Sequence, residues 1–185
     1  MAGQGAYIFG CEGARLSQAE KAFFAKAQPW GFILFARNVS DPAQLSALTY
    51  QLRDAVGRNA PVLVDQEGGR VQRLRAPHWR EFLPALDQMQ QARDPIRAQW
   101  LRGRLIADDL HRVGIDMNCI PGLDLVREET HPFLKNRCLG YASAGGKGGE
   151  GVGGWLDCRW RSADHEAYSG PWAQHAGHTS RIAPG

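Results

Sequence analysis

The feature that most restricts the fold of this chain is a regular alternation of short apolar runs with helical patterns. Each apolar run is rich in aromatic and β-branched residues, which favours a buried strand. The runs that we predict to be strands cover residues 6–10, 31–35, 61–65 and 114–121. Strands that alternate with helices in this way are typical of parallel β/α units, in which helices cover the sheet.

Helix-start signals mark the segments between these runs. Ser17 begins a Ser-Gln-Ala-Glu sequence, which is the pattern of a capping box and predicts a helix that continues to about Ala27. Asp41 followed by Pro42 predicts the N-cap and the first turn of a second helix. Its apolar residues keep a helical spacing, and they are Leu45, Leu48, Leu52 and Val56. A third helix is predicted over residues 92–113, with arginines and aspartates on its solvent-facing side.

Two α/β architectures fit this order of elements, an open doubly wound sheet and a (β/α)8 barrel. No G-x-G-x-x-G sequence follows a predicted strand, so the most specific sign of a dinucleotide-binding sheet is missing. Polar residues instead follow the strands directly, and they include Arg37-Asn38, Asp65-Gln66-Glu67 and Asp124. In barrels, the carboxyl ends of the strands form the rim on which active sites lie. We therefore expect these polar residues to mark a functional rim.

Charge and cysteine usage argue against several classes of protein. The formal net charge is only +3, and no run of Lys and Arg suggests a nucleic-acid partner. No segment reaches the roughly 18 apolar residues of a membrane span, and no basic-then-apolar signal segment is found at the N-terminus. The four cysteines are widely spaced, which predicts reduced structural thiols and no metal site. We expect a soluble, cytoplasmic protein that binds neither membrane nor nucleic acid.

Several longer motifs resemble those of glycoside hydrolase family 3, above all its single-domain bacterial β-N-acetylhexosaminidases. The most specific is the Asp-Gln-Glu-Gly-Gly-Arg-Val-Gln-Arg sequence over residues 65–73. The other matching stretches are residues 31–38, 114–124 and 136–140, and the resemblance covers about residues 6–143. The sequence departs from the family pattern at Gly122, where relatives usually carry a larger apolar residue. The resemblance implies a (β/α)8 barrel of which this chain holds about the first half.

The resemblance also implies an activity, namely removal of terminal N-acetylglucosamine from cell-wall fragments with retention of configuration. A retaining enzyme forms a covalent intermediate on one carboxylate and uses a second group as acid and base. In this family the nucleophile is an Asp near a late strand, and the acid/base is an Asp-x-His pair on a loop after Lys-His-x-Pro-Gly-His-Gly. Neither motif occurs in this sequence. We therefore expect no catalytic residue in this chain and no hydrolysis by it.

Three residues match positions that contact the sugar in the family. Asp65 is expected to accept hydrogen bonds from sugar hydroxyls, with a turn-capping carboxylate as the alternative. Arg73 is expected to donate to sugar oxygens, with a structural ion pair to Asp65 or Glu67 as the alternative. Arg137 matches a later binding arginine. Glu67 is predicted to be structural because Gly68 and Gly69 beside it indicate a tight turn.

Two aspartates flank the fourth predicted strand. Asp124 is predicted at the rim, whereas Asp116 is predicted to cap or pair locally. The resemblance implies no metal and no cofactor. It implies an N-acetylglucosamine-containing glycan or muropeptide as the partner, and a monomer is expected.

Residues 144–185 do not continue the resemblance. Glycine dominates residues 145–154, and Trp155, Trp160 and Trp172 follow without helical or alternating periodicity. We predict a disordered tail after a first domain over residues 1–143. The tail can be explained as the original gene read in the wrong frame. Codons for residues 164–173, read one base later, permit Ile-Met-Lys-His-Ile-Pro-Gly-His-Gly, and the codons that follow permit Asp-Thr-His. The DNA around codons 143–154 tests this hypothesis.

Two other functions remain open at this level. The chain could be a sugar-binding barrel fragment without catalysis, although sugar sites need groups from several strands. It could also belong to a different barrel enzyme that acts on phosphate esters. The phosphate site of such barrels normally follows strands seven and eight, which the predicted elements do not reach.

Overall fold

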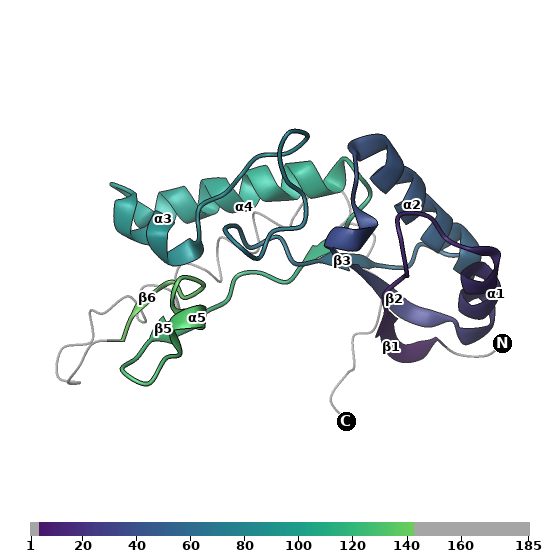
Figure 1. Cartoon of the computed structure of the whole chain (residues 1–185), viewed down its shortest axis with the longest axis horizontal. Helices are drawn as coiled ribbons and strands as arrows, with labels where there is room; N and C mark the ends of the chain where they lie inside the picture. Colours follow the sequence, from purple (N-terminus) through teal and green to yellow (C-terminus); the bar gives the residue numbers. More distant parts are fainter. Residues whose placement is uncertain (1–3, 143–185) are drawn as a thin grey trace, which may run out of the picture.

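The computed structural model describes residues 4–142, and its centre is a four-stranded parallel sheet (Figure 1). The strands are β1 (Gly5–Phe9), β2 (Pro29–Leu34), β3 (Val62–Val64) and β4 (Met117–Asn118). Their spatial order is the same as their order in the chain, β1-β2-β3-β4, and every neighbouring pair is parallel. A doubly wound sheet would reverse its strand order at a switch point, whereas a barrel adds strands in sequence. The order therefore selects the barrel architecture, of which the described residues form the first part.

Helices lie between the strands, and the two long helices that follow β1 and β2 begin where the sequence signals predict. The helices are α1 (Gln18–Ala27), η1 (Ala36–Asn38), α2 (Pro42–Val56), α3 (Ala85–Gln91), α4 (Pro95–His111) and α5 (Pro132–Lys135). Ser17 and Glu20 form the predicted capping box at the start of α1. The Asp41 side chain accepts a hydrogen bond from the Gln44 backbone N–H at 2.9 Å and so caps α2. Local hydrogen bonds of this kind are encoded within a few residues, which explains why both boundaries were predictable.

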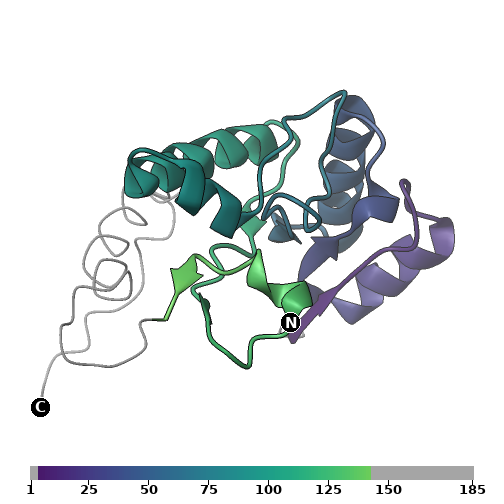
Figure 2. The same cartoon turned by 60° about the vertical axis from the view of Figure 1, so that its left-hand side comes forward.

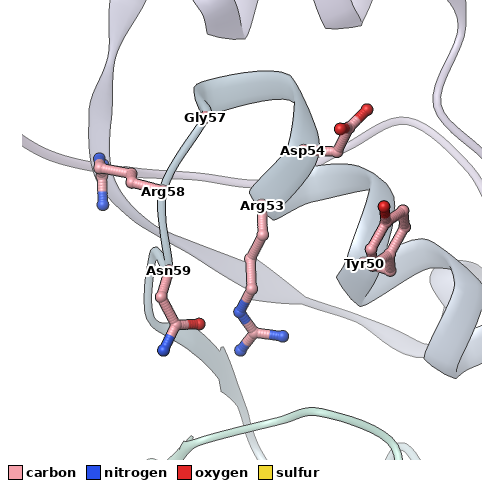
Figure 3. Close-up of a pocket in the computed structure, with 6 residues that line it drawn as sticks. All are labelled: Tyr50, Arg53, Asp54, Gly57, Arg58 and Asn59. Atoms are coloured by element: carbon pink, nitrogen blue, oxygen red, sulfur yellow. The ribbon is translucent and has the colours of Figure 1, made fainter.

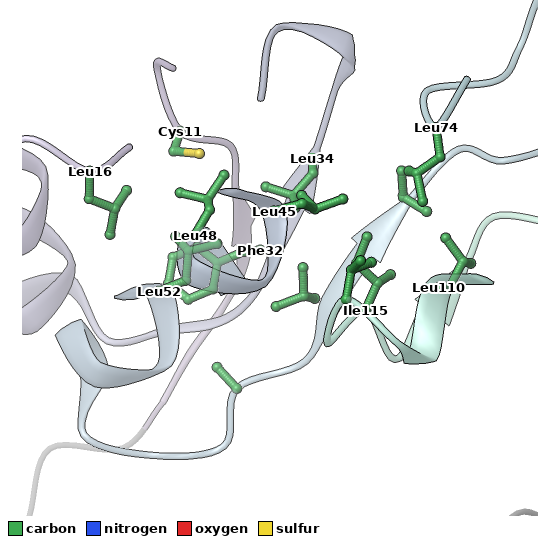
Figure 4. Packing of buried hydrophobic residues seen from close by; sticks show 14 of the residues in the cluster. Cys11, Leu16, Phe32, Leu34, Leu45, Leu48, Leu52, Leu74, Leu110 and Ile115 are labelled. Carbon is green, nitrogen blue, oxygen red and sulfur yellow. The ribbon is translucent and has the colours of Figure 1, made fainter. Parts of the chain in front are cut away.

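The core lies between the sheet and the helices α1, α2 and α4 (Figure 4). The apolar stripe predicted on α2 is buried as expected, since Leu45, Leu48 and Leu52 are fully inaccessible to solvent. From the sheet, Phe32 packs edge-on against Phe24 of α1, with the ring centroids 5.0 Å apart. Burial of this apolar surface is the main favourable contribution to folding.

Two predicted elements differ from those observed. The helix predicted over residues 92–113 begins only at Pro95, because Asp94 is its N-cap and accepts from the Arg97 N–H at 3.0 Å. A separate short helix, α3, precedes it and was not predicted. The strand predicted over residues 114–121 is reduced to β4, because the N–H groups of Gly114 and Ile115 still bond to the end of α4.

A small unit follows β4 and was also not predicted. It consists of α5 and two short parallel strands, β5 (Leu125–Val126) and β6 (Gly140–Tyr141). Figure 2 shows it turned toward the viewer, below α3 and α4. Leu86 of α3 packs with Val126 and Cys138 in a second, smaller apolar cluster. Strands of two residues carry too little periodic pattern to be recognised in a sequence. The predictions for residues 144–185, including the disordered tail, lie outside the described residues.

Asn38, one of the polar residues predicted to mark the rim, is completely buried. Its side-chain Nδ2 donates to the carbonyl oxygens of Cys11 at 3.1 Å and Gly13 at 2.9 Å, and its Oδ1 accepts from the Phe35 N–H. These bonds satisfy a buried amide and tie the loop after β1 to the end of β2. A functional role for Asn38 at the rim is therefore wrong, and its role is structural.

The buried thiol of Cys11, which contacts Asn38, predicts that the stability of the fold depends on pH. Burial, reinforced by the Glu20 carboxylate, raises the pKa of the Cys11 thiol from 9.0 to about 11. In the unfolded chain the thiol ionises first, so the unfolded state loses its proton at lower pH than the folded state. The stability that the neutral thiol contributes is therefore present below pH 9 and is lost as the pH rises toward 11. Urea titrations across this range are expected to show a smaller loss of stability in Cys11→Ala. An equal loss in both proteins would contradict the prediction.

Candidate functional site

The loop that follows β3, residues 65–74, is held in a fixed shape by Gln66. The Gln66 side chain is 1% exposed, and its Oε1 accepts from the backbone N–H groups of Arg73 at 2.8 Å and Leu74 at 3.0 Å. Its Nε2 donates to the Leu74 carbonyl oxygen at 2.9 Å. The amide thus folds the loop back on itself. Gln66 belonged to the predicted rim cluster, and the structure gives it this supporting role.

This folded loop brings Asp65 and Arg73 together at the carboxyl end of β3. Nη2 of Arg73 lies 2.7 Å from Oδ2 of Asp65, and about a quarter of each side chain is exposed. The ion pair that was the structural alternative for Arg73 is therefore present, with Asp65 as the partner. The pair is only partly covered, so part of its polar surface can meet a ligand. Nε of Arg73, by contrast, is buried and has no hydrogen-bond partner.

Glu67 lies in the same loop and directly precedes a tight turn formed by two glycines. The backbone N–H groups of Glu67 and Gly68 both donate to the Val71 carbonyl oxygen, at 2.8 and 3.0 Å. Gly68 has φ +103° and Gly69 has φ +57°. Residues with a Cβ atom rarely adopt these backbone conformations. The tight turn predicted from the Gly-Gly sequence is confirmed. The turn fixes the backbone next to Glu67.

Arg137 reaches the site from the segment between α5 and β6. Its Nε donates to Oε2 of Glu67 at 2.8 Å, and its Nη2 donates to Oε1 of Glu67 at 2.6 Å. Two parallel charge-assisted bonds of this kind fix the plane of a guanidinium. The hydrogen bonds that Arg137 donates to Glu67 raise the pKa of Arg137, and the nearby Asp65 and Asp124 carboxylates act in the same direction. Arg137 thus lies within the field of all three acids.

The three predicted site residues therefore gather at one end of the sheet, Asp65 and Arg73 in direct contact and Arg137 through Glu67. The arrangement offers carboxylate acceptors beside guanidinium donors. A sugar hydroxyl is both a donor and an acceptor, so it is suited to such a mixed surface. Asp124 directly precedes β5, and its carboxylate contributes to the raised pKa of Arg137. Its position at the rim stays a prediction.

Sequence reasoning missed two further residues at this end of the sheet. Asn118 of β4 pairs with the Gln66 backbone, accepting from its N–H at 2.9 Å and donating to its carbonyl oxygen at 3.1 Å. Cys119 follows it, and burial together with the Asp65 carboxylate raises the pKa of its thiol. Both residues lie inside the strand predicted over residues 114–121, so the sequence carried no strand-end signal for them. Only the observed β4 ends at Asn118.

The opposite end of the strands carries structural contacts. Asp116, which precedes β4, accepts from Nη2 of Arg53 at 2.6 Å and from the Val62 N–H at 3.0 Å. The predicted structural role holds, but the partners are distant in the sequence and not local. A shallow, open depression lies beside this contact, at the end of α2 (Figure 3). It is lined by Tyr50, Arg53, Asp54, Gly57, Arg58 and Asn59. In barrels this end of the strands contributes to stability rather than to chemistry.

Two kinds of feature are absent from residues 4–142, a metal-binding cluster and a membrane-spanning helix. No group of three or more His, Cys, Asp or Glu side chains in that range is arranged to hold a metal ion. Within the same range, no helix is both long enough and apolar enough to cross a membrane.

Comparison with known proteins places this chain in a family. Residues 6–142 match the model of the glycosyl hydrolase family 3 N-terminal domain. A β-hexosaminidase of Alkalilimnicola ehrlichii is 42% identical over 130 residues, which are 66% of this chain and 36% of the relative. A β-hexosaminidase of Bordetella avium is 40% identical over 118 residues, 61% of this chain and 33% of the relative. The chain thus spans about a third of the length of these curated relatives.

Solved structures of related proteins also superpose on this chain. NagZ from Neisseria gonorrhoeae, in complex with N-trifluoroacetyl-D-glucosamine, superposes with a TM-score of 0.66 at 30% identity. The match covers 74% of this chain and 42% of that protein. A family 3 β-N-acetylglucosaminidase from Paenibacillus gives a TM-score of 0.70 at 23% identity, over 88% of this chain and 29% of that protein. The latter likeness concerns the fold alone.

Proposed function

The chain belongs to glycosyl hydrolase family 3, and from this premise we propose that the whole protein removes terminal, non-reducing β-linked N-acetylglucosamine from peptidoglycan fragments. The proposed partner is an N-acetylglucosamine-containing glycan or muropeptide, bound by a cytoplasmic monomer. The observation that carries the proposal is the contact of Asp65 with Arg73 at the carboxyl end of β3, beside the Glu67–Arg137 pair. The β-hexosaminidase relatives support the same class of reaction.

The three site residues have distinct roles in this proposal. Asp65 accepts hydrogen bonds from hydroxyls of the terminal sugar, while Arg73 and Arg137 donate to its oxygens. Charge-assisted bonds to fixed groups orient the sugar, and orientation lowers the barrier of a later chemical step. The retaining reaction still needs a nucleophilic carboxylate and an acid/base group. The family motifs that carry these two groups do not occur in the sequence of this chain.

The sugar assignment is tested by NMR of the arginine side chains. Addition of N-acetylglucosamine to the 185-residue polypeptide is expected to shift the Nε–Hε signal of Arg73 weakly, and Asp65→Asn is expected to abolish the shift. Arg112 provides a control in the same spectrum, because its carboxylate partner is Asp108 of α4. A signal of Arg73 that does not respond to the sugar would reject the assignment.

Catalysis by this polypeptide is a separate question. We expect the purified 185-residue chain to release no chromophore from a chromogenic N-acetylglucosaminide above the uncatalysed rate, since it lacks both catalytic motifs. The measurement is an initial rate at high protein concentration. Release that disappears in Asp65→Asn would show that the chain is itself an enzyme, and would contradict this expectation.

A sugar-binding fragment without catalysis is the second candidate, favoured by the grouping of Asp65, Arg73 and Arg137 at one end of the sheet. Calorimetry with N-acetylglucosamine distinguishes the two. A part of a hydrolase site should bind the sugar weakly enough to shift NMR signals without measurable heat, because sugar sites need groups from several strands. A saturable heat would favour the binding function.

A further inference from the structure

We propose that Glu67 is a positioning residue, whose carboxylate orients Arg137 for the amino sugar while the buried guanidinium of Arg102 fixes the main chain beneath it. This inference rests on the proposed function, because it assumes that Arg137 meets the sugar. It assigns a role to two residues that the sugar site itself does not include.

The exposure of the Glu67–Arg137 pair is asymmetric. The Glu67 side chain is 14% exposed, whereas the Arg137 side chain is 42% exposed. Both carboxylate oxygens of Glu67 are already occupied, one by Nε and the other by Nη2 of Arg137. A carboxylate in this state is poorly placed to act as an acid or a base on a substrate. The geometry fits a supporting anion that presents a guanidinium to solvent.

The pair joins two segments that are far apart in the sequence. Glu67 belongs to the loop after β3, and Arg137 to the segment before β6. A second contact joins the same segments, because the guanidinium carbon of Arg70 lies 3.4 Å from the centre of the Phe133 ring. Nη2 of Arg70 also donates to the Phe133 carbonyl oxygen at 2.5 Å. Together these contacts hold Arg137 close to the Asp65–Arg73 pair before any ligand arrives.

Arg102 of α4 supports the loop from below. It is only 5% exposed, and its guanidinium donates to the carbonyl oxygens of Glu67 and Leu83 and to Oε1 of Gln88. Burial lowers the pKa of Arg102 to about 10, while the Glu67 charge opposes this shift, so the group remains a cation at neutral pH. A buried cation is costly unless its donors are satisfied. The carbonyl oxygens of Glu67 and Leu83 and the side chain of Gln88 satisfy the donors of Arg102. The same contacts hold the Glu67 backbone in place.

Glu67→Gln tests the proposal, since it keeps the size of the side chain and removes its charge. The readout is the Arg137 Nε–Hε signal, measured in the 185-residue chain without and with N-acetylglucosamine. Hydrogen exchange at Arg137 Nε is expected to become roughly tenfold faster or more, because a charge-assisted bond is lost. The sugar concentration that half-shifts the signal is expected to rise by about the same factor, because binding must then order the guanidinium.

Glu81→Gln is the matched control. It removes the carboxylate of the Arg75–Glu81 pair, which is 2.8 Å long and about half exposed, and should leave the Arg137 signal and the sugar response unchanged. Glu67→Asp should restore slow exchange in part, because it restores the charge on a shorter side chain.

The outcomes separate this proposal from the proposed function. If Glu67→Gln leaves the exchange at Arg137 unchanged, Glu67 does not orient it. If exchange accelerates but the sugar response is the same, the pair is only a structural link and the proposal is overturned. If neither Arg73 nor Arg137 responds to sugar in the unchanged chain, the proposed function fails and the role of Glu67 in sugar binding fails with it, whereas its control of the Arg137 side chain is still decided by the exchange rate.

Discussion

Phe32→Ala is expected to lower the free energy of unfolding by about 3–5 kcal/mol, the range measured when a buried aromatic residue is truncated to alanine. Phe32 is fully buried, and its ring packs edge-on against Phe24 of α1. Its removal leaves a cavity between β2 and the helices that the surrounding core cannot fill by a small shift. Because single domains are typically stable by only about 5–15 kcal/mol, the variant should be near its limit of stability at room temperature. Urea denaturation followed by circular dichroism measures the change.

Tyr50→Ala is the control for this substitution. Tyr50 is 70% exposed on α2, so its truncation removes an aromatic ring without opening a cavity. We expect a change within about 0.5 kcal/mol, as for most surface substitutions. Similar losses in the two variants would mean that the apolar cluster around Phe32 does not stabilise the fold in the way described.

Gly68→Ala is the second substitution for which a large effect is expected. At φ +103° the alanine backbone itself is strained, at a cost of about 1–3 kcal/mol. The added Cβ atom would also meet the guanidinium of Arg102 and the Leu83 carbonyl oxygen. Displacement of a buried cation from its acceptors adds typically about 1–3 kcal/mol, as overpacking does in other cores. The variant should be destabilised in urea, and its Arg137 Nε–Hε signal should broaden, since the Glu67 carboxylate is displaced with the loop.

Gly103→Ala makes the same chemical change with the opposite expected sign. Gly103 lies within α4, and a Cβ atom built on it has no atom within 4 Å. Alanine should therefore stabilise the helix by roughly 0.5–1 kcal/mol through its better helix propensity. If Gly68→Ala were as well tolerated as Gly103→Ala, the close approach of Arg102 to the loop after β3 would be refuted.

Much of the fold was predictable because its signals are local. The capping box at Ser17, the Asp41-Pro42 start and the apolar stripe of α2 each act within one or two helical turns, and each is found where predicted. After residue 84 the same reasoning found α4 but missed the shorter elements. There α3 and the strands β5 and β6 are too short to carry a periodic pattern, and β4 keeps only two of the eight residues predicted for it.

The candidate site was predictable in its members but not in its pairings. Asp65, Arg73 and Arg137 were identified from their place in motifs, and Glu67 was recognised as structural from the glycines beside it. The prediction that the arginines and aspartates of α4 face solvent is wrong for Arg102 and Asp109, which are buried. No feature in the sequence distinguishes Arg102 from the exposed arginines of the same helix. Asn38 and Gln66 were placed on the functional rim, whereas the structure uses both to hold loops.

The sequence by itself determined the types of the elements and their order, because strand and helix patterns depend on neighbours within a few residues. Only the tertiary structure decided that Asp65 binds Arg73 and that Glu67 binds Arg137. Arg137 lies far along the chain from Glu67, and either acid could have attracted either arginine by charge alone. The backbone path selects the partner of each acid. The loop held by the buried Gln66 side chain returns Arg73 to Asp65, whereas the segment between α5 and β6 brings Arg137 to Glu67.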